Sequence, residues 1–291
     1  MQIAYHFGVH CTDEDKLIRC LLKNRGTLAA QGIVVPGPGR YRPVLRQTLD
    51  TLQGAPATPE MQQTLLDAMM DEDEAERIVL SSESFLCPPP GALGGGALYP
   101  HAGERSAWFP PLFPEAQTEF YLAVRNLATF LPALLARPKM PQPLDALDEN
   151  DPMQLSWADM ISRIRAANPD VPITVWCDED TPLIWPEVLD AVSGHNGAVP
   201  LEALYDRVAS LLSEDGLARM QAYLESHPPQ TEDQRRRIVS AFLDKFVPAE
   251  MLEMELDLPG WSEDYVTALT ESYEDDLARI AEMRGVRLIT Q

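Results

Sequence analysis

Two runs of carboxylates are the residues best suited to chemistry in this chain. Residues 13–15 read Asp-Glu-Asp, and residues 178–180 repeat the same three letters in the same order. Clustered carboxylates suit a hard cation such as Mg²⁺ or Ca²⁺, or a basic peptide or polyamine. The first run also has a structural interpretation, in which Thr12 caps a following helix and Asp15 lies in its first turn.

Glu83 and His10 are the candidates for acid–base chemistry. Glu83 lies at the end of an apolar run, where a strand is expected to stop, and His10 lies in the turn that follows the first apolar run. Either side chain could deprotonate a hydroxyl group. The alternative for Glu83 is an ion pair with Arg125. His6 lies within the first apolar run and is expected to be buried and hydrogen-bonded.

The positions of these residues depend on four apolar runs that predict buried strands, at 3–7, 77–83, 119–125 and 171–176. Segments with helical spacing separate the runs. Strands that alternate with helices form a parallel sheet with right-handed crossovers, and ligands bind at the carboxyl ends of its strands. We therefore expect four segments at one edge of the sheet: 10–15, 81–83, 125–126 and 177–180.

The sequence predicts an α/β fold, a parallel sheet flanked by helices with a largely helical C-terminal half. Residues 1–199 are expected to form the core, which includes a loop rich in Pro and Gly at 86–115. Such a long loop is either disordered or folded over a site. Residues 200–291 are expected to pack on the core as a helical region ending in a short tail strand. The helices expected in this region span about 201–213, 214–226, 232–246 and 263–283. A further helix is expected within the core, at about 61–77.

The charge balance argues against some classes of partner. The chain has 291 residues, of which 45 are acidic and 23 are Lys or Arg, and its net charge is −22. Repulsion opposes binding to nucleic acid and to anionic membranes. No apolar run approaches the roughly 18 residues that cross a bilayer. No secretory leader precedes the first strand, and the four cysteines form no Cys-x-x-Cys pair, so a reduced, cytoplasmic protein is expected.

Several motifs resemble, in the same order, those of the bacterial P-loop sulfotransferases. That family has a strand, a His-x-Gly-x-x-Lys-Thr-Gly-Thr-Thr loop, a helix and a Gly-Ile-x-x-Pro segment. This chain has His-Phe-Gly at 6–8, then Thr12, and Gly-Ile-Val-Val-Pro at 32–36. The family's Ser-Ser-Glu at the end of the next strand is matched at 81–83, and the Arg of its 3′-phosphate element is matched by Arg125.

The resemblance implies a P-loop NTPase-like sheet and transfer of a sulfuryl group from the donor PAPS to a hydroxyl group of a small molecule or glycan. Gly8 and Thr12 would belong to the loop that holds the 5′-phosphosulfate of PAPS, and Arg125 would hold its 3′-phosphate. Glu83 or His10 would deprotonate the acceptor.

The chain departs from the family at the residues that contact the donor. The family's loop Lys corresponds to Cys11, its Gly to Asp13, and its two threonines to Glu14 and Asp15. The Ser that follows the family's Arg by eight residues corresponds to Ala133. Carboxylates beside a phosphosulfate repel it. The alternative function is therefore a catalytically inactive protein of this fold that binds a protein partner or serves as a scaffold.

Overall fold

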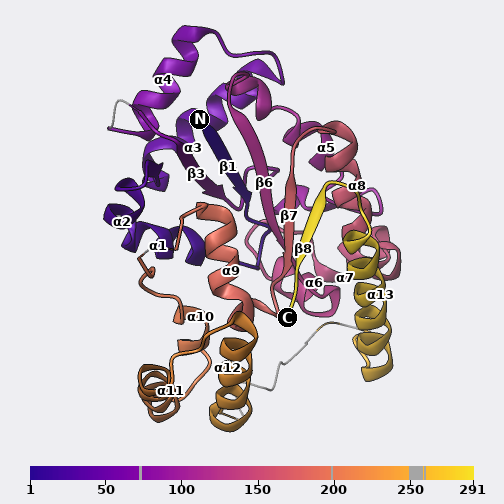
Figure 1. Cartoon of the computed structure of the whole chain (residues 1–291). Coiled ribbons are helices and arrows are strands. Elements are labelled where there is room, and N and C mark those ends of the chain that lie inside the picture. The colour runs from indigo at the N-terminus through magenta and orange to yellow at the C-terminus, as the bar shows by residue number, and fades with distance from the viewer. Residues whose placement is uncertain (72–73, 198, 249–257, 259) are drawn as a thin grey trace.

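The computed structural model describes residues 1–71, 74–197, 199–248, 258 and 260–291 of the chain. At its centre is a six-stranded sheet of parallel strands in the order β2-β3-β1-β6-β7-β8 (Figure 1). The strands are β1 (Gln2–Phe7), β2 (Ile33–Val34), β3 (Arg77–Ser82), β6 (Gln117–Val124), β7 (Ile173–Cys177) and β8 (Val286–Ile289). The predicted α/β class with a parallel sheet flanked by helices is confirmed.

Helices cover both faces of the sheet (Figure 1). One face, which includes Tyr5 and Leu80, packs against α3, α4, α5, α6, α8 and α13. The other face, which includes Val79 and Trp176, packs against α1 and α9. The helices are α1 (Lys16–Lys23), α2 (Arg25–Ala29), α3 (Pro38–Leu52), α4 (Pro59–Met69), α5 (Ala102–Ser106), α6 (Leu127–Leu135), α7 (Pro143–Glu149), α8 (Trp157–Ala167), α9 (Thr181–Ser193), α10 (Asp206–Ala209), α11 (Glu214–Ser226), α12 (Glu232–Phe246) and α13 (Glu263–Ala281).

The central strands are buried on both faces, as expected of apolar runs in a parallel sheet. All the residues of β3 are buried, including Arg77 at its start. The Arg77 guanidinium donates to Glu119 on β6 (Nη2···Oε2, 2.6 Å) and to the Val192 carbonyl of α9 (Nε···O, 3.1 Å). Because a buried cation needs such partners, Arg77 connects the sheet to the helix that covers it.

β1 lies in the middle of the sheet because later strands are added on both of its sides. Its residue Tyr5 is in register with Leu80 of β3 on one side and with Phe120 of β6 on the other. The helices that follow β1 and β6, α1 and α6, pack on opposite faces of the sheet. The two connections therefore diverge at the carboxyl edge of the sheet, which is where open α/β sheets bind their ligands.

The C-terminal region divides between the sheet and a helical pair. β8 pairs with β7, so the predicted tail strand is the last strand of the sheet. α11 and α12 pack around a small core of their own with the segment before them, made of Val208, Leu212, Met220 and Val239. Among the helices that the structure describes, none is both long enough and apolar enough to cross a membrane.

Two predicted helices are wrong in extent. The helix predicted over 61–77 ends at Met69, because the acidic residues that follow are unfavourable at the negative end of a helix dipole. Within 201–213, only Asp206–Ala209 is α-helical. The Asn24 side chain bonds both the N–H (2.6 Å) and the carbonyl (3.0 Å) of Glu202, which holds the backbone out of a helix there.

The Pro- and Gly-rich segment 86–115 is folded. It contains a short antiparallel pair, β4 (Leu93–Gly94) with β5 (Ala97–Leu98), and helix α5. Phe109, Leu112 and Phe113 are buried in the core that covers one face of the sheet. Of the two expectations for this segment, disorder is therefore wrong.

Candidate functional site

A pocket of about 490 Å³ opens at the carboxyl edge of the sheet, and we call it the carboxyl-edge pocket. Its walls come from the loop after β1, the start of α6, the β7–α9 connection and the segment around α10. Three cations and three carboxylates line it: Lys16, Arg125, Arg207, Glu14, Asp178 and Glu179. The structure thus brings together three of the four predicted segments, 10–15, 125–126 and 177–180.

The loop that leaves β1 passes very close to the end of β3. The Gly8 N–H donates to the Ser82 carbonyl at 3.1 Å. A Cβ at Gly8 would lie 3.1 Å from the backbone nitrogen of Glu83, which is tighter than nearly all real contacts. Glycine therefore favours the close approach of the two backbones. Gly8 is not among the residues that line the pocket.

The rest of the loop has an unusual backbone. Cys11, Glu14 and Asp15 have φ values of 62°, 51° and 63°, in the left-handed region that non-glycine residues rarely adopt. Such a conformation persists only where neighbouring groups hold it. Here Arg125 donates to the Cys11 carbonyl, and Arg42 forms a two-point ion pair with the Asp15 carboxylate (2.6 and 3.2 Å).

Asp13 caps helix α1, and Thr12 does not. An Asp13 carboxylate oxygen accepts a hydrogen bond from the Leu17 N–H at 2.8 Å, and the residue is 7% exposed. Thr12 instead donates its hydroxyl to the Val9 carbonyl at 2.6 Å. The predicted cap at Thr12 is therefore wrong, as is the placing of Asp15 inside the helix, which begins at Lys16. The carboxylate of Asp13 lies where helix N-termini bind external anions.

Burial raises the pKa of two carboxyl groups in this region. The pKa of Asp13 is raised to about 6 and that of Asp178 to about 7, in both cases mainly by desolvation. Arg207, whose Nη2 lies 2.9 Å from the Asp178 carboxylate, offsets part of that cost. The negative charge of Asp13 adds to the rise in the pKa of Asp178. Since Glu14, Asp178 and Glu179 line the same pocket, the two predicted acidic runs do approach one another.

The acidic runs are nonetheless bound to groups of the protein itself. Glu179 accepts from the Asn126 N–H (2.8 Å) and from the Tyr273 hydroxyl (3.0 Å). The ion pair with Arg42 lowers the pKa of Asp15. Within the described ranges, no group of three His, Cys, Asp or Glu side chains is placed to hold a metal ion. The divalent-cation site stays a prediction.

Arg125 lies at the carboxyl end of β6, as predicted, and lines the pocket. Its Nε donates to the Thr129 hydroxyl at 2.9 Å, and Nη1 donates to the Cys11 carbonyl. No carboxylate of the described residues forms an ion pair with it. Since a guanidinium has five N–H donors, Arg125 keeps donors that could bind an anionic ligand.

Glu83 pairs with Arg137, and the predicted pair with Arg125 is wrong. Both Glu83 carboxylate oxygens accept from the Arg137 guanidinium, at 2.8 and 3.2 Å. Burial raises the pKa of the nearby Cys11 thiol, and the positive charge of Arg137 opposes that rise. The segment after α6 brings Arg137 to Glu83, and neither Glu83 nor Arg137 lines the carboxyl-edge pocket.

Both candidate histidines are buried. The Tyr99 hydroxyl accepts from the His10 backbone N–H (3.0 Å) and lies 2.8 Å from the ring Nδ1. Burial lowers the pKa of His10 to about 4 and that of His6 to about 3. His6 bonds the Ser81 hydroxyl at 2.9 Å, as expected of a core histidine. His10 does not line the pocket, so it is not placed at an open edge.

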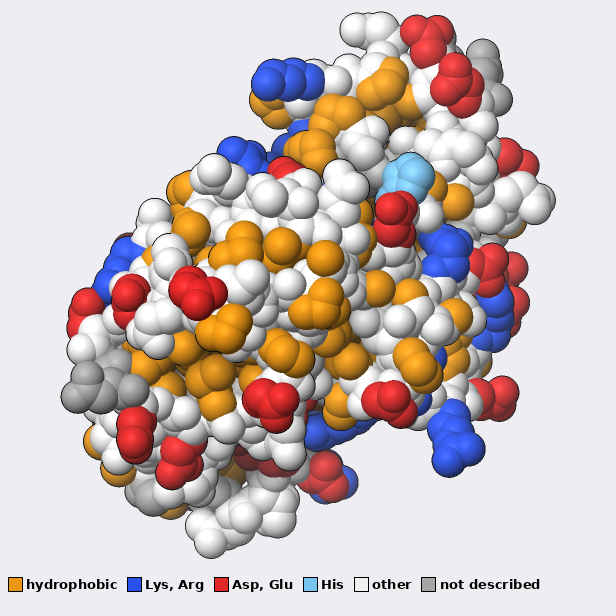
Figure 2. Space-filling view, turned by 90° about the horizontal axis from the view of Figure 1, so that it is seen from above, with side chains coloured by type: hydrophobic (Ala, Val, Ile, Leu, Met, Phe, Trp, Pro, Cys, Tyr) orange, Lys and Arg blue, Asp and Glu red, His pale blue; other side chains and the backbone are white. Residues whose placement is uncertain are grey.

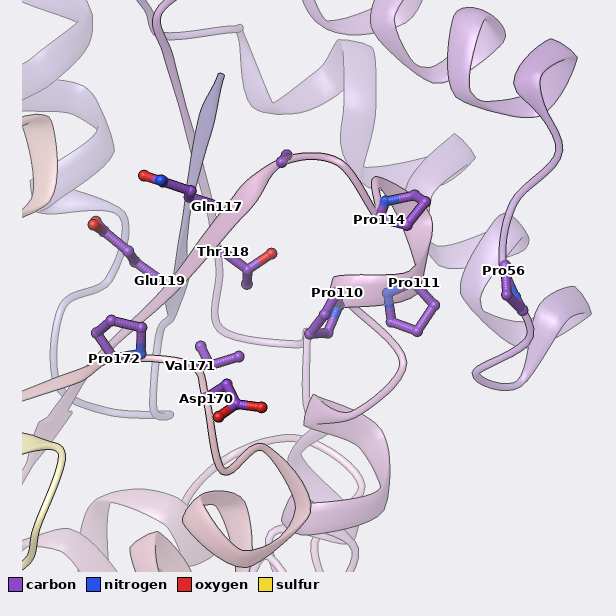
Figure 3. A pocket seen from close by; sticks show the side chains of 11 residues that line it. Pro56, Pro110, Pro111, Pro114, Gln117, Thr118, Glu119, Asp170, Val171 and Pro172 are labelled. Atoms are coloured by element: carbon purple, nitrogen blue, oxygen red, sulfur yellow. The ribbon is translucent and has the colours of Figure 1, made fainter.

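Another pocket, of about 680 Å³, lies at the opposite edge of the sheet, where β6 begins and just before β7 (Figure 3). Five prolines line it: Pro56, Pro110, Pro111, Pro114 and Pro172. Hydrophobic side chains gather on this end of the molecule (Figure 2). Of its two carboxylates, Glu119 already pairs with Arg77. Because it brings no cations together with carboxylates, it is a weaker candidate than the carboxyl-edge pocket.

Arg137, Arg207 and Tyr99 were not predicted as site residues. Each contacts a partner residue that is distant in the sequence, and the spacing of the residues around it does not predict that contact. Comparison with known proteins adds nothing to the site, because no family model, curated protein or solved structure matches the chain.

Proposed function

We propose that this chain is a sulfotransferase-like binding protein that does not transfer a sulfuryl group from PAPS. The observation that carries the proposal is the hydrogen bond from the Leu17 N–H to the buried Asp13 carboxylate. In the resembling family, the loop before this helix holds the 5′-phosphosulfate of the donor. In our proposal the Asp13 carboxylate occupies the position that this anion has in the resembling family.

The general features of the sheet support descent from that fold. The strand–loop–helix unit of β1 and α1 lies at the centre of the sheet, and Gly8 allows the loop to pass the end of β3. Arg125 follows β6 beside this loop and has no carboxylate partner in the described parts of the chain. An anionic group of a ligand would therefore bind at Arg125, the position of the 3′-phosphate in the resembling family.

The candidate bases support a binding function more than catalysis. Glu83 has both carboxylate oxygens engaged by Arg137. An acceptor hydroxyl would therefore have to compete with the Arg137 guanidinium for either oxygen. His10 is fully buried with its Nδ1 bonded to Tyr99. Neither side chain lines the pocket in which an acceptor would meet the donor.

Calorimetry with two nucleotides tests the proposal. PAP, the desulfated form of PAPS, carries phosphates at both the 3′ and 5′ positions, whereas adenosine 3′-phosphate carries only the phosphate proposed for Arg125. We expect adenosine 3′-phosphate to bind more tightly than PAP, because the 5′-phosphate of PAP meets Asp13. Arg125→Ala should abolish the binding of both.

The enzymatic alternative predicts the reverse order. Micromolar binding of PAP, with weaker binding of adenosine 3′-phosphate, would favour transfer from PAPS to a hydroxyl acceptor and contradict the proposal. Binding of neither nucleotide would leave Arg125 without the role in ligand binding that we assign to it.

A further inference from the structure

The helical pair α11 and α12 lies at the end of the molecule, away from the sheet (Figure 1). A groove of about 610 Å³ runs between α11 and α12, and we call it the α11–α12 groove. It is lined by three aromatic and three cationic side chains, with Ile238 and Ala241 between them: Tyr223, Phe242, Phe246, Arg219, Arg237 and Lys245.

The aromatic side chains form a continuous apolar floor. The ring centroids of Tyr223 and Phe242 are 6.0 Å apart, and those of Phe242 and Phe246 are 5.7 Å apart with nearly parallel planes. Tyr223 is 43% exposed, which is unusual for so large an apolar side chain in this protein. Exposed aromatic area next to a hollow is typical of interaction sites.

The cations make the groove an exception to the charge of the whole molecule. The chain carries a net charge of −22, yet three cations and no carboxylate line the groove. The Arg219 guanidinium and the Lys245 ammonium lie 5.7 and 5.4 Å from the centroid of the Phe246 ring. Arg219 pairs with Asp215, but no carboxylate of the described residues forms an ion pair with Arg237 or Lys245.

We propose that the α11–α12 groove binds an acidic amphipathic helix of a partner protein. Helices with apolar side chains at positions i, i+3, i+4 and i+7 bind in grooves of this kind. The aromatic floor would take those apolar side chains, and Arg237 and Lys245 would pair with carboxylates beside them. The exposed faces of α11 and α12 span about 20 Å, which fits about four turns of a bound helix.

A protein helix fits this surface better than a nucleic acid does. Duplex DNA presents a negative charge about every 1.7 Å of its length, and most of them would extend past the three cations toward an acidic molecule. An acidic helix brings only a few carboxylates, which the three cations can match. The groove shares no lining residue with the carboxyl-edge pocket. The proposals for the two sites can therefore be tested independently.

A designed peptide tests the groove in the full chain. The probe is a fluorescein-labelled peptide of about 16 residues with Leu at helical i, i+3, i+4 and i+7 positions and Glu at the others. We expect saturable binding by fluorescence anisotropy, and weaker binding of the same peptide with Lys in place of Glu. The double variant Arg237→Glu/Lys245→Glu should bind the acidic peptide at least about tenfold more weakly, and Tyr223→Ala should also weaken it.

The control is Arg46→Glu/Arg284→Glu, which makes the same charge change at two exposed arginines outside the groove and should bind as the parent does. Circular dichroism checks that each variant is folded. Equal binding by the two double variants, or preference for the Lys peptide, would overturn the proposal. Self-association of this chain that Arg237→Glu/Lys245→Glu abolishes would also overturn it, because the groove would then be a dimer interface. Binding to anionic vesicles in place of the peptide would overturn it as well.

Discussion

At the scale of single residues, Asp13 does for α1 what a bound anion does in phosphate-binding loops. Its carboxylate accepts a hydrogen bond from the Leu17 N–H in the first turn of the helix and complements the helix dipole. Burial opposes this arrangement and raises the pKa of the group to about 6. The folded protein therefore binds this proton more tightly than the unfolded chain does, and the associated stability is lost as the pH rises through about 6.

Asp13→Asn should accordingly stabilise the protein in a pH-dependent way. The amide oxygen can still accept from the Leu17 N–H, while the cost of burying a charge is removed. We expect the free energy of unfolding in urea to rise by about 1–3 kcal/mol at pH 8 and to change little at pH 4, where Asp13 is protonated in the folded state. An equal effect at the two pH values would contradict the raised pKa.

The partners of the site residues explain why the site was predicted only in part. The ends of the strands placed Arg125 and the acidic runs at one edge, because parallel strands share their carboxyl ends. Glu83 was expected to pair with Arg125 on the same grounds. The ion pair between Glu83 and Arg137 depends on the path of the backbone after α6, and no local pattern in the sequence predicts that path.

At the scale of elements, a carboxylate on one helix caps another. Asp276 of α13 accepts from the backbone N–H groups of Trp157 (2.6 Å) and Ala158 (3.3 Å) at the start of α8. It also accepts from the Ser156 hydroxyl at 2.7 Å. These hydrogen bonds to a buried charged group fix α13 against α8, and the sequence pattern of neither helix indicates them.

Asp276→Ala should therefore lower the free energy of unfolding by about 2–4 kcal/mol, because it leaves buried N–H groups without an acceptor. Urea unfolding at pH 7 measures the effect. The matched control is the neighbouring exposed residue, and Asp275→Ala should change the free energy by less than about 0.5 kcal/mol. Similar values for the two variants would show that α13 is held by apolar packing alone.

The elements were predicted best where burial is complete on both faces. The runs at 3–7 and 77–83 do not alternate between apolar and polar residues, which is typical of strands buried on both faces of a parallel sheet. The predicted helix at 201–213 failed because a single tertiary contact, from Asn24 to Glu202, overrides the local preference. A local sequence pattern cannot predict contacts of this kind between segments that are distant in the sequence.

At the scale of the whole molecule, two surfaces stand apart from the acidic majority. The carboxyl-edge pocket balances three cations against three carboxylates, and the α11–α12 groove presents cations over aromatic rings. The net charge of −22 predicts that the molecule repels nucleic acid and anionic membranes. It gave no indication of the groove, because a sum over the chain hides a local excess of the opposite sign.

The most direct test of the proposed function is the backbone amide signal of Leu17 in NMR spectra. If Asp13 takes the place of a phosphate at the start of α1, this amide should titrate with a midpoint near 6, following the Asp13 carboxyl group. It should not move when millimolar PAP is added. A signal that is insensitive to pH and shifts to saturation with PAP would contradict the account, because the N–H would then be free to bind the 5′-phosphate.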